Sequence, residues 1–314
     1  MKSIIKIIVC GITLAASVAN SSPWFTGPLL APAGSTIPGG HINIEPYAFY
    51  TDSFGIYDSN RRVVGVPDTH TVNISPIISI GLNDFMDIQG SFPYNYNTKQ
   101  RVDASGLGDV GITLGFQALR QHGKWIPDLR VTIGETIPTG DYQNLNPMNL
   151  GLDGNGSGSY QTTFALNFQR VDYFIKEHAL RTRLSFSGTL AKKTNIQGFN
   201  SYGGGIGTRG TIRPGDQFQA DLAFEYHLTQ NWVPVFEVNY TTRQRSSFSG
   251  QSGFNADGTV ATVGHGELDQ LSLAPAIEYN FNSNLGIIGG VWFTVKGRDA
   301  SDFVSGVIAV NYYI

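Results

Sequence analysis

The chain has 314 residues, a net charge of −3 and 14% charged side chains, against ~25% in an average soluble protein. This charge argues against the basic patch of a nucleic-acid-binding protein, so no nucleic-acid partner is expected. Glycine is enriched, with 38 residues, and aromatic residues make up 12% of the chain, which favours strands and belts of aromatic side chains at an interface.

The first 19 residues have the features of a secretory signal peptide. Lys2 and Lys6 supply a positive N-terminal region, an apolar run covers residues 7–16, and residues 17–19 (Ser-Val-Ala) form a small-x-small cleavage signal. The apolar run is too short for a membrane-spanning helix, which needs ~20 residues. Because Cys10 lies in this run, cleavage leaves a mature chain without disulfides, and its stability must come from elsewhere.

Residues 20–40 are rich in proline, glycine and serine. This composition predicts an extended N-terminal segment and not a packed element. A loose periplasmic tail is the favoured interpretation of this segment, and a segment that tucks into a barrel is the alternative.

From residue 41 onward, apolar and polar residues alternate with a period of two. Between Phe218 and Leu228, for example, Phe218, Leu222 and Phe224 share one parity, while Asp221 and Glu225 have the other. This pattern is typical of strands with lipid on one side and a wet interior on the other. The predicted strands are 41–51, 70–82, 85–94, 108–119, 128–138, 159–170, 180–191, 216–228, 231–242, 268–281, 284–296 and 303–314. Each is long enough to cross a membrane when tilted, which takes ~9–11 residues.

The connections between these strands alternate in length. The links from even-numbered to odd-numbered strands are short, such as 83–84 and 229–230. The long links from odd-numbered to even-numbered strands are 52–69, 95–107, 139–158, 192–215 and 243–267. Outer-membrane barrels combine short periplasmic turns with long external loops. We therefore predict an all-β fold, an antiparallel up-and-down β-barrel of about twelve strands over residues 41–314, in the outer membrane of a Gram-negative bacterium.

A few residues depart from this pattern. The prolines inside predicted strands are Pro46, Pro76, Pro234 and Pro275. Because proline cannot donate to the ladder, each requires a bulge or a compensating neighbour. Glu135 is the one charge on the predicted lipid-facing surface, and a bulge at Gly134 would turn it inward. The last strand ends at Ile314 and not at the aromatic residue that the barrel-assembly machinery commonly reads.

Several segments resemble one known family. These segments are SIGLNDFMDIQGSFPYNY (79–96), SGLGDVGITLGFQ (105–117), IPTGDY (137–142) and LAPAIEYNFNSNLGIIGGV (273–291). They are similar to a Gly-Leu-Thr-Asp turn, a Gly-Leu-Gly-Asp strand opening, a Pro-Thr-Gly-Asp strand exit and the paired closing strands of an outer-membrane transporter family. That family is associated with the meta-pathway of phenol degradation. The resemblance implies a twelve-strand-like barrel and passage of small, often apolar compounds, and it brings no catalytic residues.

The inward positions collect most charges of the predicted strands. The lumen-lining candidates are Glu45, Asp87, Arg130, Arg181, Arg183, Asp221, Glu225, Glu237, Glu278 and Lys296. Arg181 and Arg183 lie on one strand and Asp221 and Glu225 on its neighbour, which favours cross-strand ion pairs. Such groups either brace and plug the barrel or select solutes in a pore. Twelve strands predict a narrow or partly plugged passage.

These features predict a passive channel or transporter for small molecules, including apolar or aromatic ones, with membrane lipid and an unidentified solute as partners. A plugged structural or surface-interaction barrel is the alternative function, and a soluble secreted β-sandwich is the alternative fold. The six histidines lie in no visible catalytic set, so we expect no enzyme and no cofactor. Asp153, Asn155 and Ser157 have the spacing of a calcium loop, but Phe164 replaces the expected glutamate, which favours a flexible external loop without metal.

Overall fold

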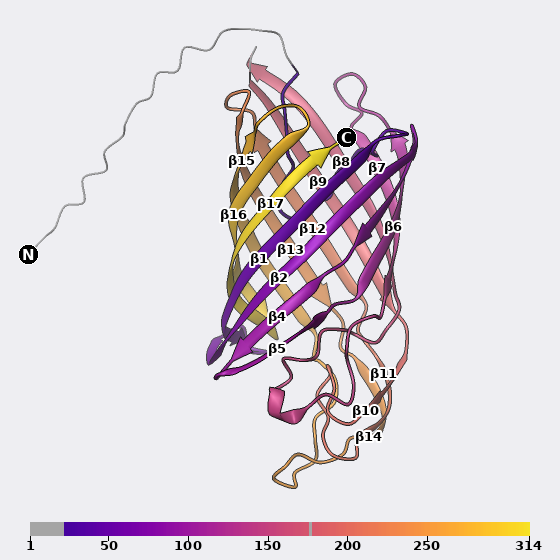
Figure 1. The fold of residues 1–314 in the computed structure, drawn as a ribbon, viewed down its shortest axis with the longest axis vertical. Coiled ribbons are helices and arrows are strands. Elements are labelled where there is room, and N and C mark those ends of the chain that lie inside the picture. Colours follow the sequence, from indigo (N-terminus) through magenta and orange to yellow (C-terminus); the bar gives the residue numbers. More distant parts are fainter. Residues whose placement is uncertain (1–21, 176–177) are drawn as a thin grey trace, which may run out of the picture.

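The computed structural model describes residues 22–175 and 178–314, so the predicted signal peptide lies outside the described part. Twelve antiparallel strands form a closed barrel, because β1 pairs with β2 along one edge and with β17 along the other (Figure 1). The wall strands are β1 (Ile42–Tyr57), β2 (Val63–Asn83), β3 (Met86–Ser91) with β4 (Tyr94–Lys99), β5 (Val102–Leu107) with β6 (Val110–Leu119), β7 (Asp128–Ile137), β8 (Gln161–Ile175), β9 (His178–Ala191), β12 (Gln217–Tyr226), β13 (Trp232–Arg243), β15 (Leu268–Asn280), β16 (Leu285–Arg298) and β17 (Ala300–Tyr313). Within the described ranges, the model contains no helix of the length and apolarity that membrane crossing requires.

The predicted barrel and its twelve strands are confirmed, but two of the predicted long loops are wrong. β1 and β2 extend toward each other until only residues 58–62 connect them, which replaces the predicted loop 52–69. β4 and β5 form a hairpin around Gln100 and Arg101, whose φ angles of 49° and 67° are left-handed, within the predicted loop 95–107. Their patterning is mixed: Tyr94 and Tyr96 of β4 are exposed on the outer face, but so are the polar Asp103 and Ser105 of β5. Because alternation distinguishes a strand only where its two faces differ consistently, this mixed pattern does not predict a strand.

Two breaks divide the third and fourth wall strands. β3 and β4 both pair with β2 and are separated only by Phe92 and Pro93. β5 and β6 are separated by Gly108 and Asp109, and the Gly108 amide donates to the Pro93 carbonyl at 2.8 Å. The two breaks therefore lie side by side in the wall and share a hydrogen bond.

The remaining long connections form an external assembly at the lower end of the barrel in Figure 1. A three-stranded sheet is built there from β10 (Thr194–Gln197), β11 (Arg209–Arg213) and β14 (Ser247–Gln251). The β7–β8 connection contributes the short 3₁₀ helix η1 (Pro147–Asn149). The long external loops are thus structured and hydrogen-bonded, including the segment with the calcium-like spacing, where Asp153 accepts the Asn146 amide at 2.9 Å.

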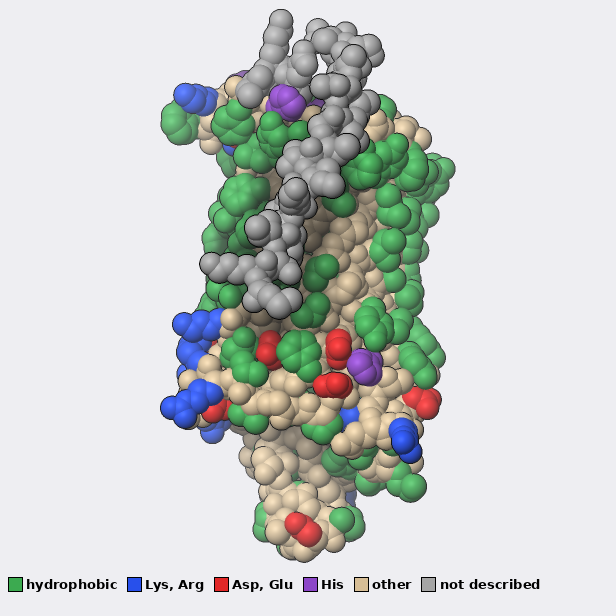
Figure 2. All heavy atoms as spheres, turned by 90° about the vertical axis from the view of Figure 1, so that its left-hand side faces the viewer, with side chains coloured by type: hydrophobic (Ala, Val, Ile, Leu, Met, Phe, Trp, Pro, Cys, Tyr) green, Lys and Arg blue, Asp and Glu red, His purple; other side chains and the backbone are tan. Residues whose placement is uncertain are grey.

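The outer surface of the wall is apolar, as the alternation predicts. Figure 2 shows hydrophobic side chains along both sides of the barrel, and most of the charged side chains in this view lie toward the external end. At the periplasmic end, Trp125 is 84% exposed, and Trp232 lies edge-on to Tyr279 with 4.7 Å between ring centroids. Aromatic rings at this level match the interfacial girdle of an outer-membrane barrel.

The prolines are accommodated by gaps in the ladder and not by bulges. Pro46 and Pro76 lie directly opposite each other between β1 and β2, and the β1–β17 pairing passes over Pro46 without a change of register. The β15–β16 pairing likewise passes over Pro275. Placing prolines opposite each other or at such gaps keeps their missing N–H groups away from pairing positions.

Glu135 stays on the outer face, and no bulge turns it inward. It lies in register with the outward Ile112, and the β6–β7 register is regular at Gly134. The Thr162 hydroxyl donates to Glu135 at 2.6 Å, and the Lys192 ammonium lies 3.7 Å away. This charge is therefore paired near the external end of the wall.

Two adjacent isoleucines of β2 provide a test of wall orientation. Ile78 is exposed on the outer surface, whereas Ile77 borders a cavity in the lumen. A basic residue on the lipid face costs about 2–4 kcal/mol at the midplane and less near the interfaces. We expect Ile78→Arg to reduce the heat-modifiable, folded barrel on gels, and Ile77→Arg to leave its yield largely intact. Equal yields of the two variants would contradict this orientation of β2.

Candidate functional site: the barrel lumen

The N-terminal segment, residues 22–40, lies inside the barrel lumen. The favoured interpretation of a loose tail is therefore wrong, and the alternative of a segment tucked into the barrel is correct. The segment reaches opposite sides of the wall: the Thr26 amide donates to Glu278 at 2.7 Å, and the Ile37 amide donates to Asp87 at 3.0 Å. Hydrogen bonds at both ends hold the segment across the lumen.

Glu237 of β13 binds the middle of the segment. Its carboxylate accepts three successive backbone amides, those of Leu29 at 2.5 Å, Leu30 at 3.0 Å and Ala31 at 2.9 Å. Glu237 is buried, and water is therefore largely excluded from these bonds. Hydrogen bonds to a charged group contribute about 1.5–3 kcal/mol each, so this side chain is a principal anchor of the segment.

Glu278 of the neighbouring strand β15 binds the preceding turn of the segment. It is fully buried and accepts the amides of Thr26 and of Gly27, the latter at 3.2 Å. The Thr26 hydroxyl also donates to Asn280 at 2.9 Å. Two adjacent strands therefore present two carboxylates at the heights where the segment has unpaired amides.

Two arginines line the lumen on β9, which is separated from β13 by β12 alone. Arg181 forms a two-point ion pair with the buried Glu225, one bond of which measures 2.6 Å, and Arg183 lies 3.4 Å from the same carboxylate. Arg183 also donates to the Ala31 carbonyl at 3.1 Å. The predicted cross-strand pairing thus occurs with Glu225, whereas Asp221 accepts from Asn239 and Gln219.

A second ion pair anchors the far end of the segment. Arg130 donates to Asp87 through two nitrogens, the shorter bond measuring 2.6 Å, and both side chains are buried. The same carboxylate accepts the Ile37 amide, and Gln117 nearby accepts the Thr36 amide at 2.8 Å. The charged lumen residues therefore pair with one another and with the segment.

One part of the lumen is apolar, contrary to the wet interior that the alternation predicts. Inward residues of β13, β15, β16 and β17 form a buried cluster against the segment. Its members are Leu29, Val233, Val235, Ala274, Ile288, Val307 and Ala309, with Phe25, Leu30, Tyr47, Phe49, Ala276 and Trp292 packed around them. The segment thus lies between an apolar surface and a charged one.

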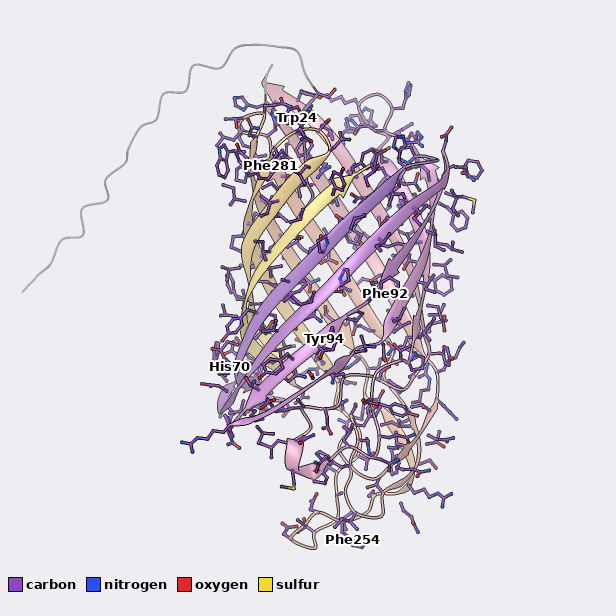
Figure 3. All side chains as sticks on the ribbon, in the orientation of Figure 1. Trp24, His70, Phe92, Tyr94, Phe254 and Phe281 are labelled. Atoms are coloured by element: carbon purple, nitrogen blue, oxygen red, sulfur yellow. The ribbon has the colours of Figure 1, made fainter. Side chains whose placement is uncertain are left out.

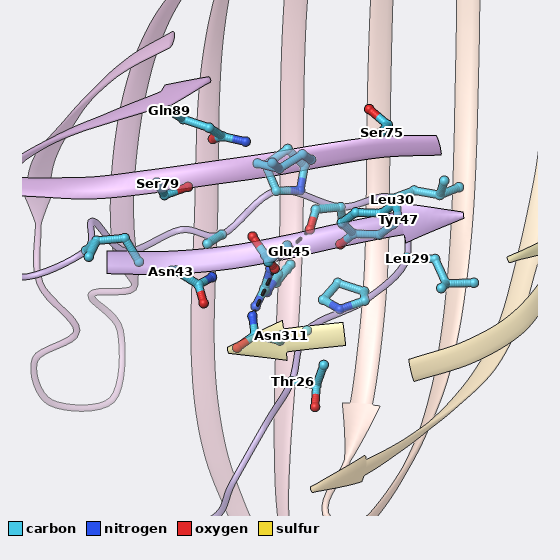
Figure 4. Close-up of a pocket in the computed structure, with 18 of the residues that line it drawn as sticks. Thr26, Leu29, Leu30, Asn43, Glu45, Tyr47, Ser75, Ser79, Gln89 and Asn311 are labelled. Atoms are coloured by element: carbon cyan, nitrogen blue, oxygen red, sulfur yellow. Dashed lines mark hydrogen bonds between the residues drawn. The ribbon is translucent and has the colours of Figure 1, made fainter. Parts of the chain in front are cut away.

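A cavity of about 360 Å³ remains between the segment and the β1–β2 wall (Figure 4). Leu29, Leu30 and Tyr47 are among its apolar lining residues. Its polar border includes Ser75, Ser79, Gln89 and Glu45, and Glu45 accepts from Asn311 at 2.9 Å. The cavity has a mixed lining that suits a small molecule with an apolar body.

Nine of the ten lumen candidates face the interior, and Lys296 is the exception. A one-residue bulge at Val295 shifts the β15–β16 register, so that Lys296 lies opposite the outward Leu271. Lys296 is exposed, whereas Thr294 before the bulge is buried. The prediction for Lys296 is wrong because a single extra residue reverses side-chain parity.

Two wall glycines are functional residues that the charge pattern did not reveal. A Cβ on Gly81 would lie 1.8 Å from the Pro38 carbonyl oxygen, and a Cβ on Gly286 would lie 1.9 Å from the Thr26 hydroxyl. Only glycine permits the segment to approach the wall so closely. Their signal in the sequence is a glycine at an inward position of a predicted strand.

Comparison with known proteins agrees with this architecture. A family model described as "Putative MetA-pathway of phenol degradation" matches residues 33–304. The chain belongs to this family. No curated protein matches its sequence.

The chain is also similar to solved structures, and one of them, with a TM-score above 0.5, shows the same fold. The chain is similar to the COG4313 outer membrane channel from Pseudomonas putida F1, with a TM-score of 0.64 and 12% identity over 90% of this chain and 98% of that chain. A mutant of the TodX monoaromatic hydrocarbon channel has a TM-score of 0.40 and 12% identity over 94% of this chain and 96% of that chain. The β domain of the Bordetella autotransporter BrkA has a TM-score of 0.47 and 11% identity over 88% of this chain and 100% of that chain. The fold is that of an outer-membrane β-barrel.

Neutralising Glu237 tests its role as an anchor. Glu237→Gln keeps the shape of the side chain but replaces a carboxylate that accepts three amides with one carbonyl oxygen. We expect the amides of Leu29–Ala31 to exchange with deuterium roughly tenfold to a hundredfold faster, as the loss of about 1.4–3 kcal/mol implies. Hydrogen-exchange mass spectrometry of the segment measures this change.

Glu267→Gln is the matched control, because Glu267 is an exposed partner of Arg298 outside the lumen. Its exchange in residues 22–40 should equal that of the wild-type protein. Unchanged exchange in Glu237→Gln would show that the carboxylate does not hold the segment.

Proposed function

We propose that this protein is a passive outer-membrane channel for small apolar or aromatic molecules. The observation that carries the proposal is the lumen cavity, whose lining combines apolar side chains, such as Leu29 and Leu30, with polar and charged ones, such as Ser75 and Glu45. Membership of the family with the phenol-degradation description supports this class of solute. The solute enters by diffusion, and residues 22–40 form the constriction that it must pass.

The lumen chemistry suits selection of solutes and not a reaction, so we propose no enzymatic activity. The lumen carboxylates Asp87, Glu225, Glu237 and Glu278 are occupied by arginines or backbone amides. A general base needs free access to the proton that it removes. We further expect the barrel-assembly machinery to insert the chain, with Tyr312 and Tyr313 near the end of the last strand as its aromatic signal.

The hydrogen bonds of the segment also support a second candidate function. Five amides of residues 26–31 are held by two buried glutamates, and such an anchor suits a permanently plugged barrel. In that case the external assembly would carry the function, as a structural or surface-interaction module. The two candidates differ in whether any solute crosses the lumen.

Filling the cavity tests the channel proposal. Ser75 borders the cavity and Ile74, its neighbour in β2, is exposed on the outer face. We expect Ser75→Trp to reduce uptake of radiolabelled toluene by Gram-negative cells whose outer membrane carries the protein, because the indole occupies the passage. Ile74→Trp should leave uptake unchanged, since tryptophan is tolerated on a lipid-facing wall.

Cells without the protein set the background rate of toluene uptake. Two results together would exclude a channel and leave the plugged barrel. They are toluene uptake at only this background rate by cells with the wild-type protein, and no single-channel conductance of the protein in a planar bilayer. Uptake above background that Ser75→Trp does not lower would show that the solute takes another route.

A further inference from the structure

The external assembly contains a second and larger cavity. Its volume is about 720 Å³, against about 360 Å³ for the lumen cavity. It lies among the β4–β5 hairpin, the η1 segment, the loop before β11 and the loop after β14. Leu145, Phe199, Ile206 and Phe254 are among its apolar lining residues. Pockets for small organic ligands typically measure 300–1,000 Å³ and are mostly apolar.

Part of the apolar lining is exposed to solvent beyond the barrel wall. Figure 3 shows Phe254 at the tip of the external assembly, well beyond the barrel. Phe254 is 55% exposed and Ile206 is 75% exposed. Large apolar side chains gathered around a cavity in water, and away from lipid, are typical of a binding surface.

Backbone hydrogen bonds fix the cavity in shape. Ile206 and Phe254 exchange two backbone bonds of 2.8 and 3.0 Å, and the Leu145 amide donates to the Phe199 carbonyl at 2.8 Å. The Tyr202 hydroxyl, two residues before Gly204 of the lining, donates to the Ser157 carbonyl at 2.6 Å. Burial, with a smaller contribution from the charge of Asp109, raises the pKa of Tyr202, so this donor stays protonated. The loops that surround the cavity are therefore held together before any ligand arrives.

The lining indicates an uncharged, flat, apolar ligand. Two phenyl rings and several aliphatic side chains offer stacking and apolar contact. Polar groups lie around them, with Lys99, Asn144 and Asn255 in reach of a hydroxyl or nitro group of the ligand. Among the lining residues, Lys99 is the one formally charged side chain, so the cavity offers no paired site for an ionic ligand.

We propose that this external cavity captures small aromatic molecules from the medium before they enter the barrel. The inference rests on the proposed channel function for its purpose, but binding in this cavity does not require transport. Capture raises the concentration of a sparingly soluble aromatic compound at the mouth of the channel.

Nitrobenzene is a suitable probe, because it quenches a fluorescent dye on contact. The described part of the chain contains no cysteine, so a single Met148→Cys places a bimane dye beside the cavity, next to the lining residue Pro147. We expect nitrobenzene to quench this dye along a saturable curve. A dye on Ser283→Cys, in a periplasmic turn, should be quenched linearly with concentration, as collisions alone require.

Two glutamate variants in the Met148→Cys background locate the binding. Ile206→Glu places a charge in the lining and should raise the half-saturating nitrobenzene concentration at least about tenfold. Ser249→Glu is the control, because Ser249 is exposed on β14 of the same assembly and does not line the cavity. It should leave the curve unchanged. Heat-modifiable migration establishes that each variant is folded before the titration.

The outcomes separate this proposal from the channel function. Linear quenching at Met148→Cys, or a saturable curve that Ile206→Glu does not alter, would overturn the external site. Adding Ser75→Trp, which fills the lumen cavity, should leave the saturable curve in place. A protein that binds nitrobenzene externally but takes up no toluene would retain the external site and lose the channel.

Discussion

The irregular backbone inside this barrel needs hydrogen-bond partners, and this need determines which side chains line the lumen. A chain that crosses the lumen outside any sheet presents amides that the ladder cannot satisfy, and a buried amide without a partner is costly. Glu237 and Glu278 satisfy five of these amides between Thr26 and Ala31. This requirement explains why two carboxylates occur on the inner faces of β13 and β15 next to the apolar Val235 and Ala274. The position of the segment, and hence of the cavity left beside it, follows from these acceptors.

The lumen carries side chains of both charges, which pair with the N–H and the C=O groups of the segment's backbone. The carboxylates of β13 and β15 receive N–H groups, while Arg183 of β9 donates to the Ala31 carbonyl. Arg183 and Arg181 are balanced in turn by Glu225, so the guanidinium groups keep an acidic partner within the wall. A buried ion pair contributes little by itself, but loss of one member leaves an uncompensated charge. The segment, the glutamates and the arginines therefore form one network, and a change in any of the three affects the others.

The sequence predicted the wall because a period of two reports two different solvents on the two faces of a strand. Where short strands carry a mixed pattern, as in β4 with Tyr94 and Tyr96 outward and β5 with Asp103 and Ser105 outward, that difference weakens, and the sequence alone indicated a loop. The charge pattern located the acceptors Glu237 and Glu278 but not their donors. Those donors lie about 200 residues away in a segment without periodicity, whose path depends on contacts that form only in the closed barrel. Lys296 shows the limit of parity counting, since one extra residue at a bulge reverses the face of every residue that follows.

The two cavities place different demands on a solute. The external cavity is the larger and the more apolar, whereas Ser75, Ser79 and Glu45 make the lumen cavity partly polar. Passive conduction requires sites that bind well enough to admit a solute and weakly enough to release it, so in the proposed channel the lumen cavity is expected to be the weaker of the two sites for an apolar molecule. Widening the lumen cavity requires the segment to move, and each amide separated from its carboxylate without a new partner costs about 1–3 kcal/mol. Movement is therefore least costly where fewest such bonds exist, between Ala31 and Thr36. That stretch borders the cavity through Pro32, Ala33 and Ser35, and the hydrogen bond from Gln117 to the Gly34 carbonyl, at 3.2 Å, holds it to the wall, so a displacement there separates fewer bonds than a displacement at either anchor.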